Sequence, residues 1–126
     1  MSNSAKTVFI FGCYLILLGL TLLLVPNLLL GLFRFLPTTE VWIRVVGMLV
    51  LFLAVYYLVA AQAEIRLFML WSTRLRGSVI FFFGAFVLAG LAPPVLLLFG
   101  AVDLAGALWT WSALRKEAPI QPSRVA

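Results

Sequence analysis

The stretch PVLLLFGAVDLAGALWTWSALR, residues 94–115, decides the fold because it is long and apolar enough to cross a membrane as a helix. Its one acidic residue is Asp103. At 1.5 Å per helical residue, Asp103 lies about 13 Å from Pro94 and about 18 Å from Arg115, near the middle of an apolar layer about 30 Å thick. An acid at that depth usually faces the interior of a helix bundle, where it pairs or lines a pathway.

The composition excludes a soluble globular domain. Of the 126 residues, 65% are hydrophobic and 10% are charged, and the mean hydropathy is +1.20. Four spans of about 21 residues each would occupy most of the chain and leave only short loops and tails. The sequence therefore predicts an all-α polytopic membrane protein, with residues 1–126 forming a single four-helix transmembrane bundle.

Turn residues separate the apolar runs and place the four spans at about residues 7–25, 41–61, 66–91 and 94–115. The third run is long, and residues 64–77 have an alternative interpretation as an amphipathic surface helix. That alternative would leave only residues 78–91 for the span, too few to cross a bilayer. We therefore favour one long, tilted helix from residue 66.

Lysine and arginine residues sort by side of the predicted bundle. Only Arg34 and Arg44 fall on one side, whereas seven fall on the side of the two termini: Lys6, Arg66, Arg74, Arg76, Arg115, Lys116 and Arg124. Cytoplasmic segments carry the excess of such residues, so we predict an inner-membrane protein with both termini in the cytoplasm. Topology thus accounts for the basic excess, and we expect no nucleic-acid partner.

The usual reactive side chains are scarce. Histidine is absent and Cys13 is the only cysteine, which removes most metal, haem and thiol chemistry. We therefore expect no metal site, no cofactor and no catalytic residue, and we predict that the chain is not an enzyme.

Helical periodicity assigns an inward face to the third and fourth spans. At 100° per residue, Arg74 falls on one face with small residues and Arg76 points nearly the opposite way. We expect the two spans to pack through these small residues, which are Gly77, Ser78, Gly84 and Ala85 in the third span and Gly100, Gly106 and Ala107 in the fourth.

Asp103 and Arg74 are therefore candidates for a buried ion pair. Their depths from the cytoplasmic ends are about 18 Å and about 12 Å, a difference that an arginine side chain can bridge. Three interpretations stay open for Asp103. It fixes the registry of two helices, it contacts a proton, lipid headgroup or small ligand, or it bonds only to hydroxyl groups or to a partner subunit.

Other polar residues suggest smaller sites. Possible ligand-lining residues are Thr110, Ser78, Tyr56 and Tyr57. Glu40 and Arg44 are four residues apart in the favourable order for a helical ion pair, which we expect at the outer face.

Several motifs resemble small bacterial four-span proteins of the DoxX-like type. They lie between Trp42 and Arg115 and comprise Arg44-Val-Val-Gly47, Tyr56-Tyr57, Ser72-x-Arg74 and Asp103-Leu-Ala-Gly106-Ala-Leu-Trp-Thr110. The resemblance is one of size, span spacing and a late helical Asp. It implies a quinone-linked or accessory role in the membrane and assigns no cofactor residue.

The scarcity of polar groups inside the spans predicts a non-catalytic accessory or structural subunit of a larger membrane assembly. Its partners would be membrane lipids and either another protein or further copies of the chain. The alternative is a small transporter, or a lipid- or quinone-binding protein, that uses Asp103. A multidrug-type antiporter is a poor fit, because residues 7–25 contain no acid. An enzyme acting on isoprenoid or sterol-like lipids would need more polar groups converging on Asp103.

Overall fold

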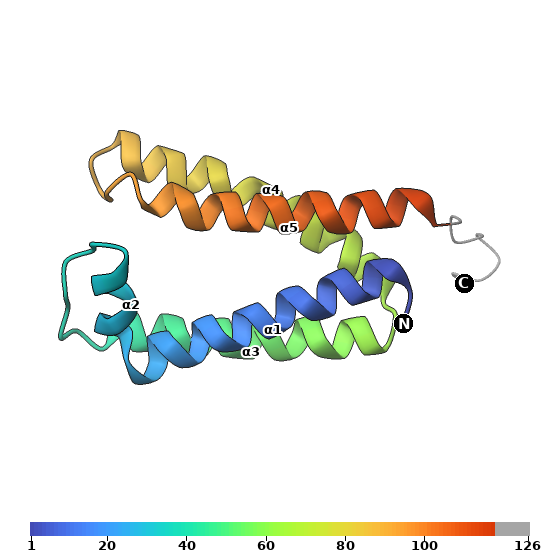
Figure 1. Ribbon diagram of the computed structural model, residues 1–126, viewed down its shortest axis with the longest axis horizontal. Helices are drawn as coiled ribbons and strands as arrows, with labels where there is room; N and C mark the ends of the chain where they lie inside the picture. Colours follow the sequence, from blue (N-terminus) through green and yellow to red (C-terminus); the bar gives the residue numbers. More distant parts are fainter. Residues whose placement is uncertain (118–126) are drawn as a thin grey trace.

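The computed structural model describes residues 1–117, and every regular element in this part of the chain is an α-helix (Figure 1). The helices are α1 (Asn3–Leu24), α2 (Pro26–Leu32), α3 (Trp42–Gln62), α4 (Arg66–Leu88) and α5 (Leu96–Lys116). The all-α prediction is confirmed. The C-terminal tail, whose cytoplasmic position the sequence predicts, lies outside the described residues.

Among the described helices, α1, α3 and α5 are long and apolar enough to cross a membrane. α4 has a similar length of 23 residues but carries Arg66, Arg74 and Arg76. These arginines set α4 apart from the other three long helices. The structure therefore supports a helical membrane protein with three helices of spanning character.

The helix ends follow local chemistry. α1 begins at Asn3, ahead of the predicted span, because the Ser2 hydroxyl oxygen accepts a hydrogen bond from the Ala5 N–H at 3.1 Å. α4 ends at Leu88 because Gly90, with φ of +75°, turns the chain into the left-handed region that glycine favours. The Leu91 N–H then donates to the Phe86 carbonyl at 2.9 Å and closes the turn.

The four long helices form two antiparallel pairs, α1 with α3 and α4 with α5 (Figure 1). The pairs meet at the end of the molecule that holds the N-terminus and the last turn of α5, which we call the closed end. They diverge towards the opposite end, where α2 lies, which we call the open end. The helices are thus in contact along each pair, but the two pairs are not in contact along their whole length.

α1 and α3 cross most closely at two glycines. A Cβ atom on Gly47 would lie 2.6 Å from the backbone nitrogen of Leu23, and a Cβ atom on Gly19 would lie 2.8 Å from that of Leu51. No side chain fits between backbones at this separation, so the crossing depends on glycine at both positions.

α4 and α5 pack through part of the predicted face. A Cβ atom on Gly100 would lie 2.8 Å from Ile80 Cδ1 and 3.3 Å from Phe83 Cδ2, so these large side chains cover Gly100. Gly77 does face Ala107, at 3.9 Å, but Gly84 has no neighbour within 4 Å. The predicted contact through Gly84 is therefore wrong, because bulky side chains on α4 set the contact face.

Five polar residues join the closed end, and we call them the terminal polar cluster: Ser2, Ser4, Glu64, Arg66 and Glu117. Glu64 accepts hydrogen bonds from the Ser2 N–H at 2.8 Å and from the Ser2 hydroxyl at 2.6 Å, and these bonds lower the pKa of its carboxyl group. Glu117 accepts from the Ser4 N–H at 3.0 Å and from its hydroxyl at 2.8 Å, and pairs with Arg66 at 3.2 Å. The cluster ties α1 to the α3–α4 turn and to the end of α5.

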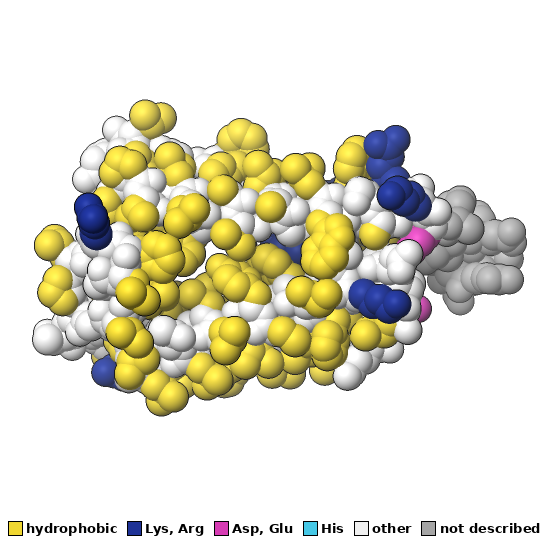
Figure 2. Space-filling view, in the orientation of Figure 1, with side chains coloured by type: hydrophobic (Ala, Val, Ile, Leu, Met, Phe, Trp, Pro, Cys, Tyr) yellow, Lys and Arg dark blue, Asp and Glu magenta, His cyan; other side chains and the backbone are white. Residues whose placement is uncertain are grey.

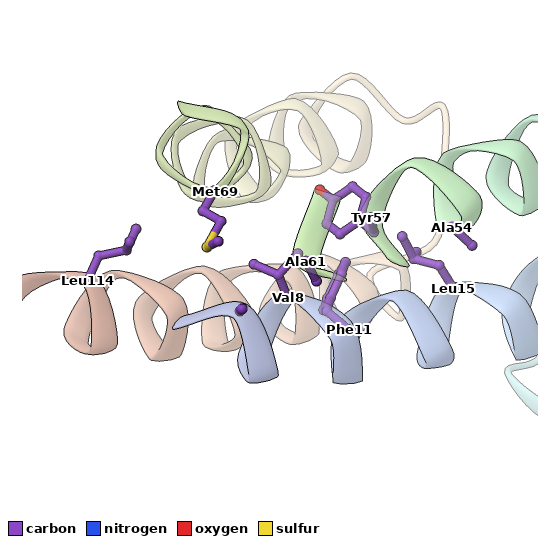
Figure 3. Close-up of a cluster of buried hydrophobic side chains, with 9 residues drawn as sticks. Val8, Phe11, Leu15, Ala54, Tyr57, Ala61, Met69 and Leu114 are labelled. Carbon is purple, nitrogen blue, oxygen red and sulfur yellow. The ribbon is translucent and has the colours of Figure 1, made fainter. Parts of the chain in front are cut away.

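Buried hydrophobic side chains from all four long helices pack together between the pairs (Figure 3). They include Val8, Phe11 and Leu15 of α1, Ala54, Tyr57 and Ala61 of α3, Met69 of α4 and Leu114 of α5. Met69 and Leu114 lie in the first turns of α4 and the last turns of α5, at the closed end. The core that joins the two pairs is therefore concentrated at that end.

Candidate functional site: a cavity between the helix pairs

A cavity of about 600 Å³ lies between the two helix pairs. Figure 2 shows this face hollowed between the pairs, with hydrophobic side chains around the hollow and Lys or Arg atoms inside it. All five helices contribute lining residues, which are mostly aliphatic or aromatic. Arg76 and Asp103 are the charged residues among them, so an apolar pocket contains one side chain of each charge.

Arg76 is held by a network within the protein. The residue is 4% exposed, and its Nε donates to the Ser72 carbonyl at 3.2 Å. Nη2 donates to the Ser72 hydroxyl at 3.2 Å and to the Thr110 hydroxyl at 2.9 Å. Ser72 lies one helical turn before Arg76 on α4, and Thr110 lies across the interface on α5, so both helices of the pair fix the guanidinium group.

A chain of hydroxyl groups extends this network to α1. The Thr7 hydroxyl lies 2.7 Å from the Thr110 hydroxyl and donates to the Ser4 carbonyl at 2.7 Å. Because Thr7 has one hydroxyl hydrogen, Thr110 is the donor to Thr7 and the acceptor from Arg76. The hydrogen bonds therefore run in one direction, from Arg76 through Thr110 and Thr7 to Ser4.

Two aromatic rings compensate part of the Arg76 charge. Its Cζ atom lies 4.5 Å from the centre of the Phe11 ring and 5.6 Å from that of Tyr57. A guanidinium group at this distance from an aromatic face gains about 0.5–2 kcal/mol. The Arg76 cation is thus stabilised from α1 and α3 without a carboxylate in contact.

One nitrogen of the Arg76 guanidinium group makes no hydrogen bond to the described residues. This nitrogen is Nη1, which is buried. Buried arginine nitrogens are normally bonded, and an unsatisfied one costs about 1–3 kcal/mol or more. Nη1 lies against Gly106 and the Phe11 ring, so the aromatic face is its compensation within the protein.

Asp103 lies in the same cavity but does not bond to Arg76. It is partly buried on α5 and makes no hydrogen bond to any described residue. The ion pair in the described part of the chain is Arg66 with Glu117, so the Asp103 oxygens lie more than 4.0 Å from the Arg76 nitrogens. The carboxylate is thus an unpartnered polar group among the residues that line the cavity.

The prediction that Asp103 forms an ion pair with Arg74 was wrong. Arg74 is exposed and its Cζ lies 4.9 Å from the centre of the exposed Trp71 ring, whereas Arg76 is buried. The prediction used small residues to assign the inward face, but the packing of Ile80 and Phe83 on Gly100 turns the Arg76 face inward. The spacing of Ser72, Arg76 and Ile80, each four residues apart, was the signal for this face.

Of the four predicted lining residues, Tyr57 lines the cavity, whereas Thr110, Tyr56 and Ser78 do not. Thr110 is fully buried and bonds Arg76, and Tyr57 is 5% exposed and lines the cavity. Tyr56 is 66% exposed, and the Ser78 hydroxyl bonds the Leu75 carbonyl of its own helix, so neither lines the cavity. Tyr14 lines the cavity but was missed, because nothing in an uncharged apolar span marks its inner face.

Glu40 and Arg44 do not form the predicted outer-face pair. α3 begins only at Trp42, so Glu40 lies outside the helix and the four-residue spacing does not bring the two side chains together. Arg44 Nη1 instead donates to the carbonyls of Leu23 at 2.6 Å and Leu24 at 3.2 Å. Arg44 therefore satisfies the last carbonyls of α1 and complements the negative end of that helix.

No family model, no curated protein and no solved structure matches this chain. The resemblance to DoxX-like proteins stays a prediction from the sequence motifs. The function is therefore argued from the geometry of the cavity.

Proposed function

We propose that this chain is a small membrane protein that binds a lipid-like or quinone-like molecule in the cavity between its helix pairs. The observation that carries the proposal is the Asp103 carboxylate, which lines an otherwise apolar cavity together with the buried Arg76 and has no hydrogen-bond partner among the described residues. A volume of about 600 Å³ lies within the range of about 300–1,000 Å³ that is typical of ligand pockets. Apolar walls with few polar groups are also typical of such sites.

The proposal includes four spans, with α4 as the third to cross. At 1.5 Å per residue, its 23 residues extend about 34 Å, enough for the apolar layer of the inner membrane. Arg76 faces the protein and not lipid, and Arg66 at the helix start bonds Glu117, so neither opposes insertion strongly. The exposed Arg74 can extend towards the headgroups beside Trp71. Both termini would then be cytoplasmic.

Ligand binding has stronger support than the predicted accessory-subunit role. That role followed from a scarcity of polar groups inside the spans. Both charged residues of one cavity, Arg76 and Asp103, lie there, and the Asp103 carboxylate has no hydrogen-bond partner among the described residues. A protein partner or a homo-oligomer is compatible with ligand binding.

Two matched valines on α3 test the proposal. Val46 is 47% exposed and lines the cavity, whereas Val55 is 51% exposed and does not line it. We expect Val46→Trp to fill the cavity and Val55→Trp to leave it open. The proteins would be extracted in native lipid particles and analysed by native mass spectrometry.

The expected result is one retained lipid or quinone molecule per chain in the parent protein and in Val55→Trp, and its loss in Val46→Trp. Equal retention in the two variants would refute the cavity as the binding site. A protein that co-purifies in stoichiometric amount, without a retained small molecule, would favour the accessory-subunit role.

A further inference from the structure

We infer that the bound molecule is an amphiphile whose head donates a hydrogen bond to Asp103 and whose tail extends towards the open end. This inference rests on the proposed function and specifies the chemistry and the direction of the ligand. It follows from the order of polar and apolar residues along the cavity and from the Asp103 carboxylate, which no described residue satisfies.

The cavity lining changes from polar to apolar along its length. Each of the four long helices contributes one polar lining residue, and these are Tyr14 of α1, Tyr57 of α3, Arg76 of α4 and Asp103 of α5. The other described lining residues are aliphatic or aromatic. On α5, for example, Phe99 and Leu96 follow Asp103 towards the open end (Figure 1).

The four polar residues lie near one level of the bundle. Three of them surround the Phe11 ring, whose centre lies 5.4 Å from that of Tyr14, 5.7 Å from that of Tyr57 and 4.5 Å from Arg76 Cζ. Asp103 comes three residues before Gly106, which contacts the same Phe11 ring, so it lies about 4.5 Å further along α5 towards the open end. The cavity therefore has one polar level with apolar walls beyond it.

Arg76 offers the ligand no hydrogen bond. Its Nε and Nη2 already donate to Ser72 and Thr110, and Nη1 is buried against Gly106. An anionic head would thus gain no hydrogen bond from Arg76 and would be repelled by the Asp103 carboxylate. The polar level therefore argues against an anionic head.

Asp103 requires a donor. An ionised carboxylate only accepts hydrogen bonds, and Asp103 is partly exposed in the cavity lining without a donor among the described residues. A hydrogen bond to a charged group contributes about 1.5–3 kcal/mol, more than one between neutral groups. A head with an O–H or N–H group would gain this contribution, whereas an ether or ester head would not.

The apolar part of the cavity suits a hydrocarbon tail. At 1.5 Å per residue, it extends about 10 Å along α5 from Asp103 to Leu96. Leu29 and Leu30 of α2 line the cavity at the open end. The α2 end is tied to the loop that follows it, because the Asn27 side chain exchanges two hydrogen bonds with the backbone of residue 38, at 2.9 and 3.0 Å. The tail would therefore extend from Asp103 towards α2.

Photo-crosslinking in lipid nanodiscs tests the donor. Two diazirine probes of equal chain length, a long-chain alcohol and its methyl ether, would be compared at alkaline pH, which favours the ionised carboxylate. The ether keeps the acceptor oxygen but lacks the donor. Cavity adducts would be mapped by mass spectrometry and divided by adducts on the lipid-facing surface of α3, which corrects for membrane partitioning. We expect the alcohol to label the cavity about tenfold more than the ether, equivalent to about 1.4 kcal/mol.

Two substitutions on α5 assign the preference to Asp103. Asp103→Leu removes the acceptor, so the alcohol and the ether should label the cavity equally. Val102 is 39% exposed and does not line the cavity, so Val102→Leu should keep the tenfold preference. A preference that survived Asp103→Leu would overturn the inference, because another residue would then accept the hydrogen bond.

The position of the diazirine tests the direction. A diazirine next to the alcohol head should label Tyr57, and one at the end of the tail should label Leu29 and Leu30. The reverse order would overturn the inference, and so would equal labelling by alcohol and ether in the parent protein, a comparison that needs no variant. Cavity labelling no higher than that of the α3 surface, with Val46→Trp and Val55→Trp behaving alike, would instead refute the proposed function.

Discussion

The contacts within each helix pair differ in kind from the contacts between the pairs. Within the α1–α3 pair, backbones approach closely at Gly19 and Gly47, and within the α4–α5 pair Ile80 and Phe83 cover Gly100. Between the pairs, hydrogen bonds such as Thr7 with Thr110 and Ser4 with Glu117 join the closed end. Each pair thus behaves as a packed unit, and a few polar bonds and one core cluster set how the two units sit around the cavity.

The largest effect is expected from a change within a pair. Gly47→Leu places a side chain where a Cβ atom already lies 2.6 Å from the Leu23 backbone nitrogen, so α1 and α3 must separate. Overpacking typically costs about 1–3 kcal/mol, and we expect the upper end or more because backbone must move. Thermal unfolding in detergent measures the loss.

Gly84→Leu is the matched control for Gly47→Leu. Gly84 has open space around it, so the same substitution on α4 should change stability by no more than about 0.5 kcal/mol. If both variants lost equal stability, the close crossing of α1 and α3 would not be what holds that pair together.

A smaller effect is expected from the polar bonds between the pairs. Thr110→Val keeps the side-chain shape but removes the acceptor for Arg76 and the donor to Thr7. Hydrogen bonds between membrane helices are worth about 0.6 kcal/mol on average and up to about 1.7 kcal/mol, so we expect a loss of about 1–2 kcal/mol. The same unfolding assay gives the value.

Thr21→Val is the control, because among the described residues the Thr21 hydroxyl bonds only the Leu17 carbonyl of its own helix. It should leave stability nearly unchanged. Thr110→Val should also reduce ligand retention, since Arg76 is then no longer fixed from α5. A variant that lost stability but retained the ligand fully would separate the network from the binding site.

The sequence predicted the helices far better than their faces. Apolar runs and turn residues marked the long helices to within a few residues, because span length follows from membrane thickness. It was harder to predict which face of each helix points into the protein, since a membrane helix is apolar both towards lipid and towards its neighbours. Asp103 was recognised as an inward residue because a buried charge is rare. Arg76 was assigned outward because only packing between Ile80, Phe83 and Gly100 decides the rotation of α4.

The smallest expected effect lies in the terminal polar cluster, where Glu64 holds the start of α1 through Ser2. Hydrogen bonds from Ser2 lower the pKa of Glu64 in the folded protein. The attachment is therefore complete above the unfolded pKa of about 4.3 and is lost as the pH falls through the lowered folded value. Amide hydrogen exchange at Ser2 should accelerate over that acid range, relative to its intrinsic rate, while exchange at the buried Val8 stays slow.

Glu64→Gln should give Ser2 the faster exchange already at neutral pH and remove its acid dependence. Because Glu64 is exposed, water competes for the same bonds, and the change should stay local to the first turn of α1. If Glu64→Gln instead lowered global stability as much as Thr110→Val, the cluster would be a main support of the closed end. The contrast between tightly packed helix pairs and a weakly joined closed end would then be wrong. The surface hydrogen bonds of Glu64 would hold the two pairs together as firmly as the buried bonds of Thr110.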